Sequence, residues 1–170
     1  MANTFIKIQT ITVGSGGVAN IEFTSIPQTY TDLLILISMR TTRSAAVDAI
    51  NVGFNGGYTN LTSRELYGSG TGVGSGTDPS SNYVGYVSGN TATANVFGNG
   101  ALYIPNYTSA NFKSSSGDSV SENNGSQAFQ SLEANLFSNT AAITSIKLAS
   151  YLSNNLMEYS TATLYGIKNT

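Results

Sequence analysis

Ser25-Ile-Pro-Gln-Thr-Tyr-Thr-Asp-Leu-Leu-Ile-Leu-Ile-Ser-Met39 contains the only long unbroken apolar run of the chain, Leu33 to Ile37. A run of large aliphatic residues predicts a central strand that is covered on both faces, inside a sandwich or beneath a neighbouring subunit. A buried helix is disfavoured because the run is short and because Pro27 presets a turn and holds Ile26 extended. We expect the rest of the fold to be arranged around this strand.

Short stretches of alternating or β-branched apolar residues follow one another along the chain, separated by glycine, asparagine and serine. Residues 5–13 and 18–23 flank Gly14-Ser-Gly-Gly17 and predict a first hairpin. Similar patterns predict further strands over residues 32–40, 49–54, 82–88, 93–104, 110–116, 127–137, 143–149 and 162–167. Together they predict a single all-β domain over residues 1–170, an antiparallel, jelly-roll-like β-sandwich of about 8–10 strands.

Two neighbouring segments do not fit this pattern. Residues 58–67 mix helix-like spacing with strand formers and are expected to be irregular. The segment Gly68-Ser-Gly-Thr-Gly-Val-Gly-Ser-Gly-Thr77 is of low complexity and predicts a flexible surface loop. It contains no phosphate-binding glycine motif.

Composition removes several kinds of chemistry. The chain has no histidine and no cysteine, which excludes Ser-His-Asp and Cys-His catalysis, and a metal site would have to be built from oxygen atoms alone. Its nine acidic residues form no recognisable pattern for a glycosidase pocket. We therefore expect no enzymatic activity, no metal and no cofactor.

Charge is sparse and evenly scattered. Only 9% of residues are charged and the net charge is −2, so no basic footprint for nucleic acid is present. No apolar stretch approaches the roughly 20 residues of a membrane span, and residues 1–5 do not resemble a signal peptide. We expect a protein that is made in a host cytoplasm and binds neither nucleic acid nor membrane.

Tyrosine is the residue type that most suggests binding, because it buries a large area and keeps a polar tip. Six tyrosines fall in the middle of the sequence, next to predicted loops: Tyr58, Tyr67, Tyr83, Tyr86, Tyr103 and Tyr107. We take these as candidate interface residues. They would serve either as half-buried sheet residues and subunit contacts, which we favour, or as stacking platforms for sugars.

Several blocks of the chain together resemble a family of small proteins encoded in tailed-bacteriophage genomes. The resemblance spans nearly the whole chain and rests on residues 26–33, 54–56, 104–107, 142–148 and 160–167, with Ile-Pro-Gln-Thr-Tyr-Thr-Asp and Leu-Tyr-Gly-Ile recurring together in that family. It implies a β-sandwich component of the virion that decorates the capsid or forms part of a fibre. It implies no catalytic residues.

We favour a capsid decoration, or cement, protein that binds the major capsid protein or other virion proteins and stabilises the head shell. One compact domain without a fibre shaft, heptad repeats or an anchoring segment fits this role. Few charges protect the sheet edges, so we expect a homo-oligomer, with a trimer favoured by the resemblance. The alternative is a tail-fibre or head-fibre module that binds a host surface glycan.

Overall fold

The computed structural model describes residues 4–125 and 127–168. These residues form twelve strands and no helix. The strands are β1 (Phe5–Thr12), β2 (Asn20–Phe23), β3 (Asp32–Met39), β4 (Val47–Phe54), β5 (Leu61–Gly68), β6 (Val73–Asp78), β7 (Asn82–Ser88), β8 (Gly98–Ile104), β9 (Lys113–Ser121), β10 (Phe129–Phe137), β11 (Ile146–Ser150) and β12 (Thr161–Ile167). Residues 1–3, part of the segment in which no signal peptide is predicted, lie outside the described residues.

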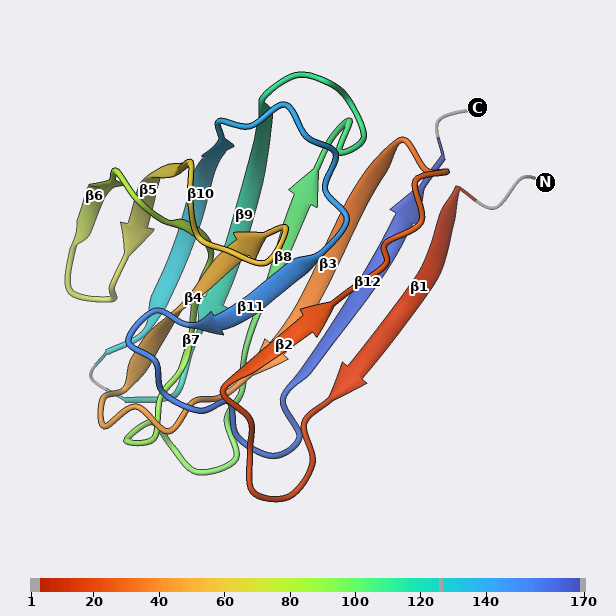
Figure 1. Cartoon of the computed structure of the whole chain (residues 1–170). Helices are drawn as coiled ribbons and strands as arrows, with labels where there is room; N and C mark the ends of the chain where they lie inside the picture. The colour runs from red at the N-terminus through yellow and green to blue at the C-terminus, as the bar shows by residue number, and fades with distance from the viewer. Residues whose placement is uncertain (1–3, 126, 169–170) are drawn as a thin grey trace.

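The strands form two antiparallel sheets that pack face to face (Figure 1). The larger sheet has the order β1-β12-β3-β8-β9-β10-β5-β6, and the smaller has the order β2-β11-β4-β7. The predicted all-β sandwich is confirmed, with twelve strands in the described residues in place of the expected 8–10.

Eight of the strands account for the basic topology. They form two quartets, β1-β12-β3-β8 in the larger sheet and β2-β11-β4-β7 in the smaller sheet, and the chain passes repeatedly from one quartet to the other. This is the strand order of a jelly roll. Two hairpins, β5–β6 and β9–β10, are inserted into this framework and extend the larger sheet beyond β8. The larger sheet therefore reaches past the smaller one on the side of the inserted hairpins (Figure 1).

Strand β3 is central, but it is not buried on both faces. It pairs with β12 on one side and β8 on the other, and Leu33, Ile35 and Met39 on its inner face are fully buried. On its outer face Leu36 is 43% exposed. The expectation of two covered faces is wrong within the chain, because no second layer of described residues covers the outer face of the larger sheet.

The predicted first hairpin is also wrong. β1 pairs with β12, and β2 lies in the smaller sheet beside β11, so the turn at Gly14-Ser-Gly-Gly17 carries the chain from one sheet to the other. Both predicted strands and the turn between them are present, but a tight turn does not reveal whether its flanking strands pair or separate into two layers.

The segments expected to be irregular or flexible form the β5–β6 hairpin. Gly74 and Gly76 both face inward on β6, opposite Tyr67 and Glu65. A Cβ atom at either glycine would collide with the side chain of its partner. Glycine at every second position is thus a strand pattern here, because it leaves room for two large side chains to lie across β6.

The two faces of β3 predict different responses to a buried charge. Replacing the fully buried Ile35 by aspartate should destabilise the fold by several kcal/mol, because the carboxylate has no partner. Replacing Leu36 by aspartate should leave the melting temperature nearly unchanged, because this side chain is exposed in the single chain. Thermal unfolding of both variants tests this, and an equal collapse would mean that a further subunit covers the outer face.

Candidate functional site

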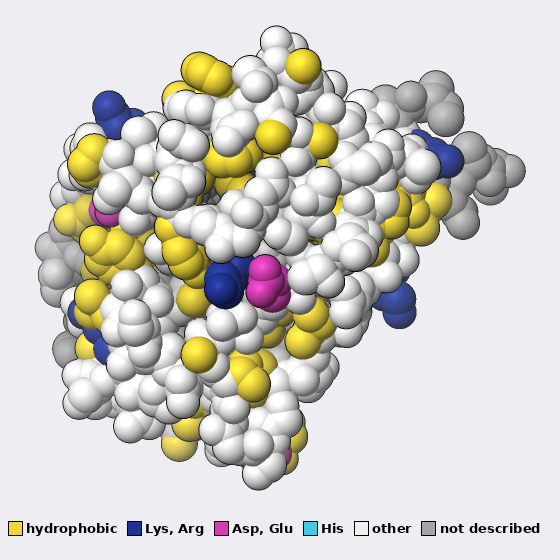
Figure 2. Space-filling model, in the orientation of Figure 1, with side chains coloured by type: hydrophobic (Ala, Val, Ile, Leu, Met, Phe, Trp, Pro, Cys, Tyr) yellow, Lys and Arg dark blue, Asp and Glu magenta, His cyan; other side chains and the backbone are white. Residues whose placement is uncertain are grey.

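A cleft of about 480 Å³ lies where the larger sheet extends beyond the smaller one. Its floor is the inner face of β5, β6 and β10, and its wall comes from β4 and β7. Arg43 and Tyr151, from loops that flank the smaller sheet, complete the rim. The surface view shows apolar side chains gathered on the left, on the side of the inserted hairpins, and few charges on this face (Figure 2). The volume lies within the range of about 300–1,000 Å³ that is common for small-ligand sites.

Strand β7, which forms the wall, has a bulge that directs two tyrosines to the same side. The register of β7 against β4 shifts by one residue, so that Ile50 pairs with Gly85 but Asn51 pairs with Tyr83. Tyr83 and Tyr86 would face opposite sides of a regular strand, since side chains alternate. The extra residue of the bulge shifts the alternation by one position, so that both tyrosine side chains face the cleft.

Polar side chains of the larger sheet hold this bulged strand in place. The Asn135 amide donates to the Tyr83 carbonyl at 2.8 Å and accepts from the Tyr83 N–H at 2.9 Å. The Ser119 hydroxyl accepts from the Tyr86 N–H at 2.7 Å. These bonds satisfy backbone groups on the free edge of β7 that no other strand pairs. Gly85 has φ 135°, and a Cβ there would collide with Ser119, so the close approach requires glycine.

Because β7 approaches so closely, β10 is oriented against its hydrophobic pattern. Ser131, Glu133 and Asn135 face inward and are buried. Leu132, between them, points to solvent and is 58% exposed. The alternation predicted from the sequence is present, but space between the sheets, and not hydrophobicity, decides which set is inside.

Two groups of aromatic rings line the cleft or adjoin it. The Phe129 ring lies 4.6 Å from that of Tyr86, tilted by 34°, and 5.6 Å from that of Tyr67. The Tyr83 ring meets Tyr151 edge-on at 5.5 Å between centroids. The first group presents a broad apolar surface with phenol groups at its margin, a form suited to the face of a sugar ring or another flat apolar group.

Three carboxylates lie among these rings. The Tyr86 hydroxyl donates to Glu65 at 3.1 Å, and the Tyr83 hydroxyl donates to Asp78 at 2.6 Å. Glu133 pairs in register with Glu65 across β5 and β10. It is 4% exposed, and its Oε2 atom has no hydrogen-bond partner among the described residues.

The surroundings shift the pKa values of two cleft carboxylates in opposite directions and raise those of the two phenols. Burial raises the pKa of Glu133 to about 7, and the negative charge of Glu65 adds to the rise, against hydrogen bonding from Ser131. Burial alone would raise the pKa of Asp78, but hydrogen bonds from Tyr83, Ser80 and Ser81 hold it below its ordinary value. Burial and the neighbouring carboxylates raise the pKa of the Tyr83 and Tyr86 phenols, which stay protonated donors.

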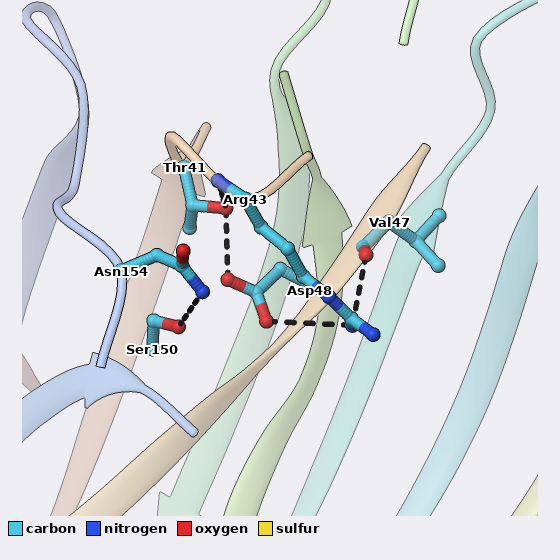
Figure 3. A network of polar contacts seen from close by, with 6 residues as sticks. All are labelled: Thr41, Arg43, Val47, Asp48, Ser150 and Asn154. Atoms are coloured by element: carbon cyan, nitrogen blue, oxygen red, sulfur yellow. Dashed lines mark hydrogen bonds and ion pairs between the residues drawn. The ribbon is translucent and has the colours of Figure 1, made fainter. Parts of the chain in front are cut away.

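Arg43 is the one cationic side chain among the described residues that line the cleft, and it is already engaged (Figure 3). Its Nη1 atom lies 3.6 Å from Oδ1 of the fully buried Asp48 and donates to the Val47 carbonyl at 3.1 Å. Thr41 donates to the other Asp48 oxygen at 2.8 Å. Asp48 thus offsets the positive charge of Arg43, and the cleft retains a negative excess.

Of the six predicted tyrosines, three lie in or beside the cleft and three lie elsewhere in the fold. Tyr83 and Tyr86 line the cleft, and Tyr67 stacks on Phe129 beside it. Tyr58 packs against the core, Tyr103 lies on the outer sheet face with its hydroxyl donating to Asp32, and Tyr107 is fully buried, donating to the Pro27 carbonyl.

No motif in the sequence predicts the remaining cleft residues Arg43, Glu65, Asp78, Phe129, Glu133 and Tyr151 as site residues. A usable signal exists for some of them. Glu65 and Tyr67 are two residues apart in β5, and Phe129 and Glu133 are four apart in β10, so each pair shares a strand face. No local signal links β5 to β10, which are far apart in the sequence.

Comparisons with protein-family models, with curated proteins and with solved structures find no match to this chain. Within residues 4–125 and 127–168, no group of three or more acidic side chains is arranged so that it could hold a metal ion. The same residues contain no helix that is long and apolar enough to cross a bilayer.

Glu133 should make stability depend on pH. Its pKa is about 7 in the fold against an ordinary 4.5, so the folded chain binds the proton more tightly and ionisation opposes folding. Stability should fall as pH rises from about 4.5 to about 7 and then level off. Glu133→Gln, which resembles the protonated acid, should gain about 2–3 kcal/mol over the native chain at pH 8 and almost nothing at pH 4.

Chemical denaturation across this pH range measures the difference, with Glu158→Gln, outside the cleft, as the matched control. A gain of the same size at every pH would show that Glu133 is not the group that titrates.

Proposed function

We propose that this protein is a binding module of a phage virion and that its cleft binds carbohydrate. The observation that carries the proposal is the combination, in one cleft, of the Tyr86–Phe129 aromatic surface with carboxylates and phenols at its margin. Small-ligand sites commonly combine apolar walls with a few fixed polar groups. A sugar offers a ring face to the aromatic side chains and hydroxyl donors to the carboxylates.

The virion part of the proposal rests on the resemblance of the sequence blocks to tailed-phage proteins. In a virion, such a module would contact a host surface glycan. We propose that the module acts by binding alone. The chain has no histidine or cysteine to act as base or nucleophile.

Affinity electrophoresis in gels that contain neutral or amino polysaccharides tests the proposal. Phe129→Ala and Tyr86→Ala should each weaken retardation by about tenfold or more, as expected for an aromatic anchor worth more than about 1.4 kcal/mol. Tyr159→Ala is the matched control, because Tyr159 is exposed outside the cleft. Equal retardation of all three variants would contradict the proposal.

A second candidate is capsid decoration, favoured by the outer face of the larger sheet. Leu66 and Leu132 are directly paired there, and they are 61% and 58% exposed. The same row continues in register through Asp118 and Ala101 to Leu36. One charge in a row of five residues leaves a flat, weakly charged surface that the capsid shell or further copies of this chain, such as the other subunits of a trimer, would cover.

Particle composition distinguishes the two candidates. Decoration predicts on the order of hundreds of copies per virion by quantitative mass spectrometry, following the symmetry of the shell, whereas a fibre predicts a few tens or fewer. Leu132→Asp should also abolish binding to undecorated shells without lowering the melting temperature. Retained shell binding in this variant would exclude the outer face as the contact.

A further inference from the structure

The cleft is more specific than a general sugar site, because one of its buried polar atoms has no partner. Asp78 accepts bonds from Tyr83 at 2.6 Å and from the Ser80 N–H at 2.8 Å, and Glu65 accepts one from Tyr86 at 3.1 Å. Oε2 of Glu133 accepts none from the described residues, although its residue is only 4% exposed. A buried, unpartnered carboxylate oxygen that lines a cleft is suited to a donor brought by a ligand.

The charges around Glu133 select the kind of donor. β5 contributes Glu65 directly opposite, β6 contributes Asp78, and β7 contributes the phenols of Tyr83 and Tyr86. On its other side β9 contributes Gly117, which carries no charge. The Arg43 guanidinium is offset by Asp48 at 3.6 Å. The cleft therefore has a negative excess that a cation would relieve and that an acidic sugar would increase.

We propose that the cleft recognises a saccharide that carries a free amino group, with the ammonium bound at Glu133 beside Glu65 and the sugar ring on the Phe129–Tyr86 surface. This inference rests on the carbohydrate-binding function proposed above. A metal ion is a poorer occupant, because Glu133, Glu65 and Asp78 line the same cleft but are not gathered closely enough to hold one together. The ammonium needs only a few acceptors and receives a charge-assisted bond.

Titration calorimetry of the full chain tests the inference with three oligosaccharides of equal length: a glucosamine oligomer with free amines, its fully N-acetylated form, and the corresponding neutral glucose oligomer. At pH 7 the free-amine oligomer should bind about tenfold or more tightly than the other two, because a hydrogen bond between charged groups is stronger than one between neutral groups. Its affinity should rise from pH 5 towards pH 7 as Glu133 ionises, and fall again at higher pH as the sugar ammonium loses its proton.

Glu133→Gln should reduce this preference to within about threefold, whereas the control Glu158→Gln should keep the preference. Equal affinity of the native chain for amino and neutral oligomers would overturn the amino-sugar inference and leave the proposed function standing. Absence of binding to any of the three would overturn both. Binding of trilysine as tight as that of the amino oligomer would also overturn the inference, because the aromatic surface would then contribute nothing.

Discussion

The structure depends on the hydrogen bonds that join the bulged β7 strand to the inner face of β9 and β10. The Asn135 amide binds both backbone groups of Tyr83 and thereby acts as a short piece of strand. Without it and Ser119, backbone groups on the free edge of β7 would be buried between the sheets without partners, at a cost of about 1–3 kcal/mol each. The position of Tyr83 and Tyr86, and hence the wall of the cleft, follows from these bonds.

The site is an addition to the fold and not part of its framework. Eight strands build the double sheet, and the inserted hairpins β5–β6 and β9–β10 contribute Glu65, Asp78, Phe129 and Glu133. Because the polar extension is separate from the hydrophobic framework, substitutions can alter the extension without disrupting the core. The cleft lies on the side of the hairpins, whereas β1 forms the opposite edge of the larger sheet, so a partner bound along β1 would leave the cleft open (Figure 1).

The sequence predicts the fold class because the core strands have strong local signals. The run Leu33 to Ile37 marks the central strand correctly, but it does not reveal that Leu36 faces outward into solvent. Three of the six candidate tyrosines lie in or beside the cleft, whereas Phe129 and Glu133 are not predicted from the sequence, because the residues they meet are far away in the chain. Bulges and the spacing of two sheets are set by tertiary contacts, which composition and periodicity do not contain.

The inward polar face of β10 also sets a folding problem for this chain. A slip of one residue against β5 and β9 would turn Leu132 and Leu136 inward and bring Glu133 to the surface, while Phe129 and Phe137 would turn outward. Only the correct alignment lets Asn135 meet the backbone of β7. Hydrophobic burial alone therefore does not specify the register of β10, and polar recognition between strands helps to select it.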